Sequence, residues 1–499
     1  MRNLKNQSAM THAVKRHTSK PVVLACVLAS FTLLSACASS VKSLDKAVPQ
    51  PDQPLKTEVP AGAKPLRLAE VGSEKWWEIN QIPELNAVIE KALAHNTDVR
   101  LAEQRLNEAG ALLGLAKTDK WPAIFGQFSN TRNRPTQAGN VPVFGNQNVY
   151  ETTNLTIAAS WEIDLWGRIR DLESAAAAQF MQQGYNLKGV RLTVSAMTAT
   201  LYTRQRVLDL VVRLTEDTLK SREDALKLEK QRYDAGLSNE LALRQVESEY
   251  LSVKALLPDY REQLAQNTTA LSVIVGGNTP PIPKLSTSGL YINPIMIVPD
   301  EAPSELLLRR PDLMAAEQQL LAGDANLSAA RKAFFPSLSL TAAGGRESAM
   351  FDNLFTGPAK VWNFSASITQ PIFQAGRLND LQDAAVARRN QAVLSYEAAI
   401  RNAFREVYDG IALQREARER LQTREAQVAT LKQVVALAEK RVAAGVSSQL
   451  ELLDAQRNLL NAELAWATAW GNQQRALLAM VTALGGGFDS RVPETRPAQ

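Results

Sequence analysis

Histidine and cysteine are almost absent from this sequence. Its 499 residues include three histidines and two cysteines, and most of these lie within residues 1–36. Only His95 and Cys37 remain beyond that segment. One histidine and one cysteine cannot form a Cys/His zinc site, a catalytic Cys–His pair or a disulfide framework within one chain. We therefore predict that the protein is not an enzyme, holds no metal or cofactor, and carries His95 on a helix surface.

A surplus of positive charge is also missing from most of the chain. The whole sequence has 56 basic and 51 acidic residues, a formal net charge of +5. Such a surplus can indicate a nucleic-acid or anionic-membrane partner. Residues 1–36, however, contain five basic residues and no acid, and the remainder has 51 of each sign. We therefore expect no nucleic-acid partner.

The apolar run at 21–36 has 16 residues, fewer than the roughly 20 that a transmembrane helix needs. Basic residues precede it, which is the layout of a secretory signal peptide. It ends in Leu34-Ser35-Ala36-Cys37, which resembles the lipobox of bacterial lipoproteins. The resemblance implies that residues 1–36 are removed and that Cys37 carries a diacylglycerol and an N-acyl chain such as palmitate. Ala38, in place of an aspartate, implies the outer membrane; the alternative is a plain signal peptide with an incidental cysteine.

The rest of the chain contains one unit twice. Residues 98–106 match 312–320, and Gly167 matches Gly376 in the same order along the chain. An ordered series of such matches indicates an internal duplication. We divide the chain into a signal peptide, a lipidated tether, a first repeat, a linker, a second repeat and a tail, at 1–36, 37–70, 71–284, 285–303, 304–488 and 489–499.

Each repeat begins with a helical stretch that a proline ends, followed by two segments of strand character. Residues 337–341, for example, alternate serine or threonine with leucine, as a half-buried strand does. Polar loops with turn residues separate the strands, so that each pair is predicted to be a hairpin. The helical stretches are about 83–118 and 304–333, and the strands are about 123–132, 151–165, 337–346 and 362–373.

Proline is absent from 143–257 and from 372–492. Helices in globular proteins average about 11–12 residues, so these tracts predict unusually long ones. Apolar residues recur every seven positions in both, which indicates helices that supercoil on neighbours; ordinary antiparallel bundle packing is the alternative. Gly236 and Gly445 interrupt the tracts and predict tight turns between helices.

Four strands in one chain cannot close a barrel, and an open sheet in lipid leaves unsatisfied edges. Three chains would supply twelve strands, an even number large enough to enclose a lumen.

The chain resembles the TolC-like outer-membrane factors, in particular the NodT-type lipoproteins that serve efflux pumps of the resistance-nodulation-division type, over about 71–488. The motifs that carry the resemblance are Trp76-Trp77, Pro83-Glu-Leu-Asn86, Asp164-Leu-Trp-Gly-Arg168, Pro303-Ser-Glu-Leu-Leu-Leu-Arg-Arg-Pro-Asp312, Phe335-Pro-Ser-Leu-Ser-Leu340, Gln370-Pro-Ile-Phe-Gln-Ala-Gly-Arg377 and Thr482-Ala-Leu-Gly485.

The resemblance implies a membrane α+β fold: a homotrimeric twelve-stranded outer-membrane β-barrel, four strands per chain, continued by a long α-helical periplasmic barrel. It implies the exit duct of a tripartite pump that contributes to antibiotic resistance, with a periplasmic adaptor (membrane fusion) protein, an inner-membrane resistance-nodulation-division transporter and outer-membrane lipid as partners. The alternatives are a type I secretion channel of the same fold and a non-conducting coiled-coil lipoprotein.

Two acids near the second turn are the candidate periplasmic gate. Glu451 and Asp454 are three residues apart and share a helix face. The resemblance implies that three copies form a ring of carboxylates, which would attract cations; a solvated acidic face is the alternative. The first repeat has Ala242 and Gln245 at the matching positions.

The remaining candidate residues follow from the resemblance and from their places in the repeats. Gly167 and Gly376 are predicted to turn strand into helix. Trp161, Trp166 and Trp362 lie at predicted strand ends and are candidates for an interfacial aromatic girdle or for a core role. The residues predicted to contact the adaptor at the helical tips are Arg232, Gly236, Ser238, Arg441, Gly445 and Ser447.

Overall fold

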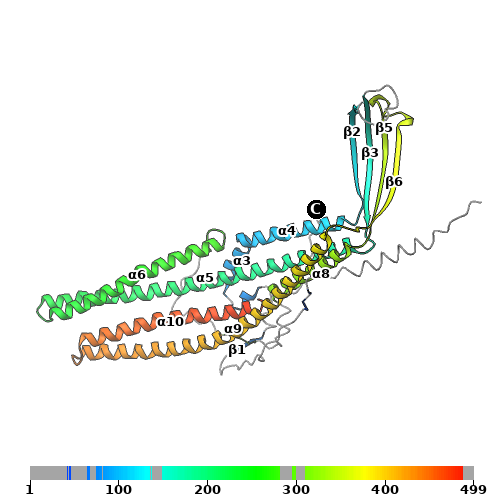
Figure 1. Cartoon of the computed structure of the whole chain (residues 1–499). Coiled ribbons are helices and arrows are strands. Elements are labelled where there is room, and N and C mark those ends of the chain that lie inside the picture. The colour runs from blue at the N-terminus through cyan, green and yellow to red at the C-terminus, as the bar shows by residue number, and fades with distance from the viewer. Residues whose placement is uncertain are drawn as a thin grey trace, which may run out of the picture.

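In the described part of the chain a four-stranded sheet lies at one end, and long helices extend away from it (Figure 1). The computed structural model describes residues 42, 44–45, 64–67, 75–80, 82–134, 136, 149–280, 295–298 and 310–486. The predicted signal peptide, Cys37, most of the tether and the tail lie outside the described residues.

Four antiparallel strands form the sheet, in the order β2-β3-β5-β6. Both predicted hairpins are present, and β3 also pairs with β5, which joins the two repeats into one sheet. The prediction of a strand through 370–373 is wrong, because Pro371 has no N–H to donate to a ladder. The bounds are β2 (Ala123–Asn133), β3 (Tyr150–Ile163), β5 (Ser337–Ser348) and β6 (Lys360–Thr369).

The register gives the sheet two chemically different faces. Paired residues point to the same side of an antiparallel sheet, and successive residues alternate. One side, called the apolar face, contains Ile124, Phe128, Leu155, Ile157, Ala159, Trp161, Leu338, Leu340, Ala342, Trp362, Phe364, Ala366 and Ile368. The other side, called the hydroxyl face, contains Gln127, Ser129, Thr131, Thr152, Asn154, Thr156, Ser160, Ser339, Thr341, Asn363, Ser365 and Ser367. Phe125 and Val361 are large apolar residues on the hydroxyl face.

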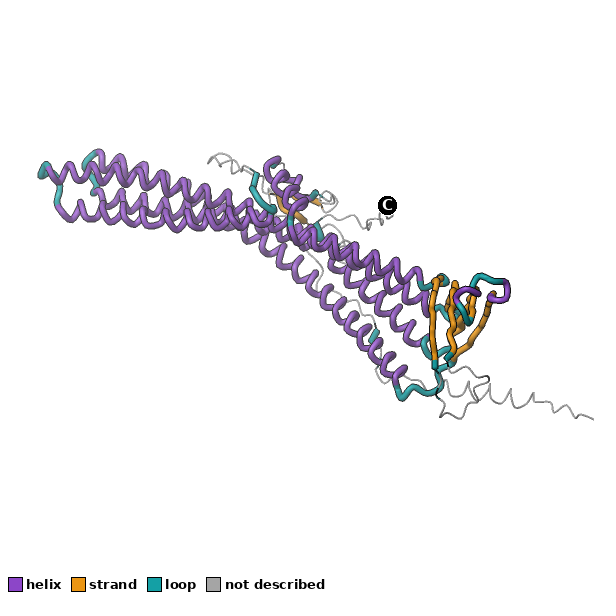
Figure 2. Tube along the Cα trace, turned by 90° about the horizontal axis from the view of Figure 1, so that it is seen from above, coloured by secondary structure: helices purple, strands orange, loops and turns teal. Residues whose placement is uncertain are grey.

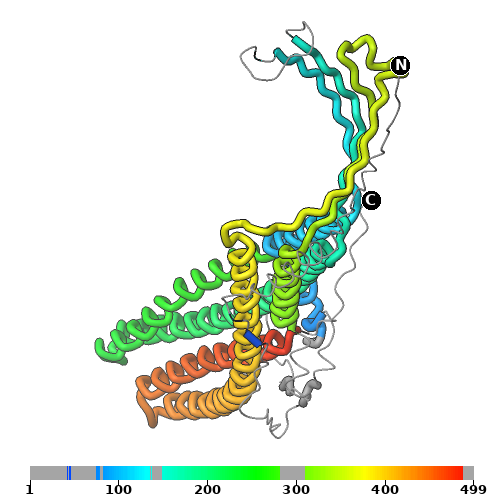
Figure 3. Tube along the Cα trace, turned by 45° about the vertical axis from the view of Figure 1, so that its right-hand side comes forward, coloured from blue at the N-terminus to red at the C-terminus, as the bar shows by residue number. Residues whose placement is uncertain are grey.

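The strands curve at their base and continue into the helices (Figure 3). The two longest helices, α5 (Arg168–Asp234) and α9 (Arg377–Ala443), have 67 residues each, which corresponds to about 100 Å. Each folds back through a tight turn into a shorter antiparallel partner, α6 (Glu240–Ile274) or α10 (Gln449–Ala483). The two hairpins extend in the same direction and bend near their middle (Figure 2).

The apolar heptad seam is buried in the middle of the helices and ends before the tips. Val212, Val428 and Val435 are buried, whereas Tyr233, which continues the series towards the tip, is exposed. The seam thus fades towards the first tip, whereas a small apolar cluster of Val435, Ala438 and Ala455 remains near the second tip.

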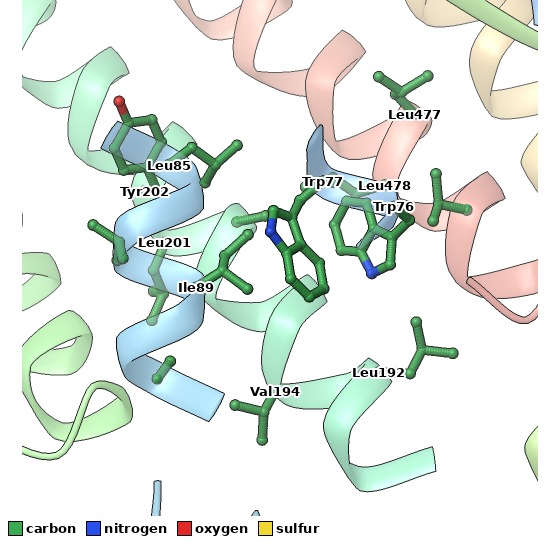
Figure 4. Packing of buried hydrophobic residues seen from close by; sticks show 14 of the residues in the cluster. Trp76, Trp77, Leu85, Ile89, Leu192, Val194, Leu201, Tyr202, Leu477 and Leu478 are labelled. Carbon is green, nitrogen blue, oxygen red and sulfur yellow. The ribbon is translucent and has the colours of Figure 1, made fainter. Parts of the chain in front are cut away.

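Among the described residues, a large apolar cluster packs η2 and α3 against α5 and α10 (Figure 4). Trp76 and Trp77, in a 3-10 helix η2 (Trp76–Asn80), are both buried and meet edge to face with ring centroids 5.8 Å apart. The Trp76 indole N–H donates to Ser195 Oγ of α5 over 3.1 Å. This cluster joins the short helices to the long ones and so holds the two repeats together.

The predicted helix at 83–118 is in fact two helices, α3 (Pro83–His95) and α4 (Thr97–Thr118). Asn96 divides them, because its side-chain oxygen accepts the N–H groups of Asp98 (2.8 Å) and Val99 (3.3 Å) and starts α4. Its Nδ2 donates to the carbonyl of Ile274, at the end of α6, over 3.0 Å. Gly276 has a φ of 70°, and a Cβ there would lie 2.8 Å from the carbonyl oxygen of His95. His95 itself is exposed, as predicted.

The remaining elements connect distant parts of the chain. Parallel strands β1 (Lys64–Arg67) and β4 (Ile295–Val298) pair the predicted tether with the predicted linker, a contact that was not expected. Leu44 donates its N–H to Asn390 Oδ1 (2.9 Å), and Asn390 Nδ2 donates to the carbonyl of Lys42 (2.8 Å). Helix α8 (Pro311–Lys332) precedes β5, and two 3-10 turns, η3 (Phe351–Asn353) and η4 (Gly357–Ala359), lie between β5 and β6.

Replacement of Asn96 tests the junction between α3, α4 and α6. Asn96→Ala removes a helix cap and a buried hydrogen bond, so we expect a loss of about 1–3 kcal/mol of stability. The measurement is the midpoint of loss of helical circular dichroism when the detergent-solubilised protein is heated. Asn186→Ala, an exposed site on α5, is the control; equal midpoints for the two variants would contradict the assigned role.

Candidate functional site at the helical tips

The two tips have the same backbone geometry. Gly236 and Gly445 each have a φ of 71°, which glycine adopts without steric cost. The N–H of Gly236 donates to the carbonyl of Tyr233 (2.9 Å), and the next N–H donates to the carbonyl of Arg232 (2.8 Å). The second tip repeats both bonds, from Gly445 and its successor to Val442 and Arg441, at 3.0 Å each. This is the Schellman ending of a helix, and it explains why glycine occurs at both turns.

Each tip also holds a serine, a carboxylate and an arginine together. At the first tip, Ser238 Oγ donates to Glu229, a buried residue of α5 that lies 3.9 Å from Arg232. At the second tip, Ser447 Oγ donates to Glu451.

The carboxylate at the second tip comes from the opposite side of the turn. Glu451 belongs to α10, which follows its turn, whereas Glu229 belongs to α5, which precedes its turn. Glu451 lies 3.5 Å from Arg441 Nε. The duplicated backbone thus carries the same three groups in two different arrangements, which the repeat alignment alone does not reveal.

Glu451 and Asp454 lie on one face of α10 with side chains 50% and 51% exposed. Neither is an isolated charge. Asp454 Oδ1 pairs with Arg457, and Asp454 Oδ2 accepts from Asn458 Nδ2 over 3.2 Å. The two candidate acids therefore face solvent with an arginine beside each of them.

Arg457 links the two hairpins. Its NH1 lies 3.3 Å from Glu249 Oε1 on α6, so the same guanidinium contacts a carboxylate on α10 and another on α6. Next to this link is a hollow of about 410 Å³ lined by Glu249, Ser448, Leu450, Glu451, Leu453, Asp454 and Arg457.

A buried arginine makes a second link between the hairpins. Arg222 on α5 is 1% exposed, and its NH1 donates to Gln456 Oε1 on α10 over 2.6 Å. Burial lowers the pKa of the Arg222 guanidinium from its ordinary value; Glu249 opposes this shift and Arg457 adds to it. Within the described residues Arg222 Nε has no hydrogen-bond partner, so a buried charge is held here with few compensating bonds.

The sequence does contain a signal for Arg222. A second series with a seven-residue spacing lies three residues after the apolar seam of α5. It consists of Thr215, Arg222 and Glu229, and all three are buried. Polar residues at seam positions indicate a polar contact between helices. Glu249 and Arg457 carry no such signal, because they come together only when α6 and α10 are side by side.

At the base of the sheet, Gly167 and Gly376 immediately precede α5 and α9 with φ values of 78° and 87°. Asp164 accepts the N–H groups of Ile169 (3.1 Å) and Arg170 (2.9 Å), which caps α5. The chain therefore changes from strand to helix within a few residues in both repeats.

Two of the candidate girdle tryptophans lie at the helical end of the sheet and the third lies at the loop end. Trp166 stacks on Phe335 with ring centroids 5.1 Å apart, and Trp161 Nε1 donates to the carbonyl of Lys120 over 2.9 Å, both at the helical end. Trp362 lies near the loop end of β6 and is 83% exposed.

Among the described residues, no helix is both long and apolar enough to cross a membrane. Within the same residues, histidine, cysteine and carboxylates form no cluster of three that could hold a metal ion.

Comparisons with known proteins agree with the duplicated architecture. The solvent efflux pump outer membrane protein SrpC of Pseudomonas putida is 32% identical over 445 residues, which cover 88% of this chain and 94% of that protein. The cation efflux system protein CusC of Escherichia coli is 30% identical over 407 residues, 81% of this chain and 86% of that protein.

A crystal structure of the open state of the MtrE outer membrane channel of Neisseria gonorrhoeae superposes with a TM-score of 0.76 at 27% identity, covering 90% of this chain and all of that one. The resemblance to TolC-like factors is confirmed, and with it the fold of four antiparallel strands and long helices. Residues 88–277 and 302–486, one segment in each repeat, match the family described as outer membrane efflux protein, and the chain belongs to this non-enzymatic family of outer-membrane channels.

Proposed function

We propose that the chain forms, as a homotrimer, the outer-membrane exit duct of a tripartite efflux pump. The observation that carries this proposal is the sheet with one apolar face, one hydroxyl face and, within the described chain, two unpaired edges at β2 and β6. Three copies pair all these edges in a closed barrel of twelve strands, with the apolar face towards lipid and the hydroxyl face towards a lumen.

The dimensions of the apolar face fit a membrane. Its rows extend from Leu338, opposite Ile163, to the row of Leu155 and Phe128. Eight steps along an antiparallel strand span about 27 Å. The tilt of roughly 35–45° in outer-membrane barrels reduces this to a height of about 20 Å, comparable with their apolar band of roughly 25 Å. The hydroxyl face would line the lumen with mostly neutral polar groups and two carboxylates, Glu162 and Glu347, which suits the passage of varied small molecules.

The partners and the anchor follow the same proposal. The tips around Arg232, Gly236, Ser238, Arg441, Gly445 and Ser447 would meet the periplasmic adaptor, which connects the duct to an inner-membrane resistance-nodulation-division transporter. Cys37, outside the described residues, would carry the lipid anchor. The contacts of Lys42 and Leu44 with Asn390 support a tether that follows the outside of the helices.

The polar links at the tips would hold the periplasmic end closed. Arg457 and Arg222 connect α10 to the α5–α6 hairpin, so the hairpins cannot separate until these contacts break. Glu451 and Asp454 from three copies would form a ring of carboxylates at the periplasmic entrance. A non-conducting coiled-coil lipoprotein would not need the four-stranded sheet with its apolar face.

The acids at the tip can be tested by ion selectivity. Replacing Glu451 and Asp454 by alanine removes six carboxylates from the proposed trimer, so cation preference should fall. The measurement is the reversal potential of single channels in a planar bilayer under a KCl gradient, which should move towards zero. Glu425→Ala, an exposed acid on α9, is the control, and an unchanged potential in the double variant would remove these acids from the gate.

The link through Arg457 can be tested by conductance. Arg457→Gln breaks the contact with Glu249. Because a partly exposed ion pair is worth about 0.2–1 kcal/mol, the open population should rise by up to about fivefold for each protomer whose link must break. The fraction of time that single channels spend in the high-conductance state measures this. Arg244→Gln removes ion pairs that lie within α6 only, so it should leave the open fraction unchanged; the same response from both variants would contradict the proposed link.

A further inference from the structure

Two positive charges face each other at the loop end of the sheet. Arg346 on β5 is directly opposite Lys360 on β6, and both belong to the apolar face. Like charges at directly opposite positions destabilise an antiparallel pair. Within the described residues Lys360 forms no ion pair with a carboxylate. The pair therefore leaves a positive charge uncompensated at the edge of the apolar band.

The first repeat has no such imbalance. At the corresponding end of β2 and β3, on the same face, Arg132 is opposite Glu151. Glu151 also accepts from Asn130 Nδ2 over 2.8 Å. The uncompensated pair is thus specific to the second hairpin.

The loop between β5 and β6 folds against this corner. Arg346 NH1 donates to the carbonyls of Leu354 (3.4 Å) and Thr356 (3.0 Å), and its guanidinium lies 5.7 Å from the ring centre of Phe355. Leu354 is 1% exposed and anchors the loop. Because Arg346 points to the apolar face, its bonds hold the loop on that side of the sheet.

The same corner exposes large apolar side chains. Met350, Phe351 and Phe355 in the loop are 60%, 54% and 65% exposed, and Trp362, two residues after Lys360, is 83% exposed. Aromatic side chains beside cations are typical of the boundary between hydrocarbon and lipid headgroups. A group of this kind is unfavourable in water but stable in the headgroup region of a membrane.

We propose that Arg346, Lys360, Phe351, Phe355 and Trp362 form a binding site, the outer lipid site, for the phosphate headgroup of a phosphorylated lipid in the outer leaflet. Lys360 supplies the free positive charge for the phosphate, Arg346 positions the loop and adds to the positive field, and the aromatic side chains lie against the lipid beside the headgroup. Charge complementarity and continuity with the apolar band favour a lipid over a protein partner. The inference rests on the proposed barrel, which turns the apolar face towards lipid.

The test is binding of bisphosphorylated lipid A to the purified full-length protein in a neutral detergent, followed by native mass spectrometry. Lys360→Gln should bind about fivefold more weakly, as expected for one basic residue at an anionic lipid surface. Lys360→Glu should abolish binding. Lys360→Glu also replaces a like-charge pair with an opposite-charge pair. Without lipid, the thermal unfolding midpoint of this variant should therefore equal or exceed that of the unaltered protein.

Lys227→Glu, at an exposed position on α5, is the matched control and should bind as the unaltered protein does. Equal binding by the Lys360 variants, or equal losses in the Lys227 variant, would overturn the inference. Single-channel recording of all variants in neutral phosphatidylcholine bilayers separates the two proposals. If currents are normal but the unaltered protein binds lipid A no better than the Lys360 variants do, only the outer lipid site is refuted. If the unaltered protein gives no currents, the duct is refuted.

Discussion

The unpaired backbone groups along the two edges of one small sheet constrain the whole molecule. β2 and β6 end the sheet within the described chain, and each unpaired N–H or C=O would cost several kcal/mol in hydrocarbon. Exposure of the apolar face of the same strands to water would also be unfavourable. The proposed closure with further copies would satisfy both requirements. The two longest helices, α5 and α9, begin shortly after β3 and β6 end, so they continue directly from the strands.

Duplication produced two similar halves, and the tips show where they differ. The Schellman turns at Gly236 and Gly445 are alike because backbone geometry alone requires glycine there. The side chains around them differ, since the carboxylate comes from Glu229 before one turn and from Glu451 after the other. The sheet shows the same pattern, with opposite charges paired in one hairpin and like charges in the other. A symmetric scaffold therefore carries different side-chain arrangements in its two repeats.

Much of the fold could be predicted because its signals are local. Alternating serine and leucine from Ser337 predict a strand, and glycine at 236 and 445 predicts two turns, since each depends only on neighbouring residues. The break at Asn96 was missed, although an asparagine followed by Thr97 and Asp98 is a helix start, because the apolar spacing continues across it. The pairing of β1 with β4 could not be predicted, because it joins segments more than two hundred residues apart.

The sequence by itself determined the class of the protein. Scarce histidine and cysteine argued against an enzyme, and the long proline-free tracts with the repeated order of helix, hairpin and helix predicted the architecture. Motifs such as Gln370–Arg377 carried the resemblance to the efflux channels. Tertiary structure alone decided which charges meet. Arg222, Glu249 and Arg457 come from α5, α6 and α10, and Arg346 and Lys360 from two strands. Electrostatic energy depends on distances across the fold, which no spacing along the chain contains.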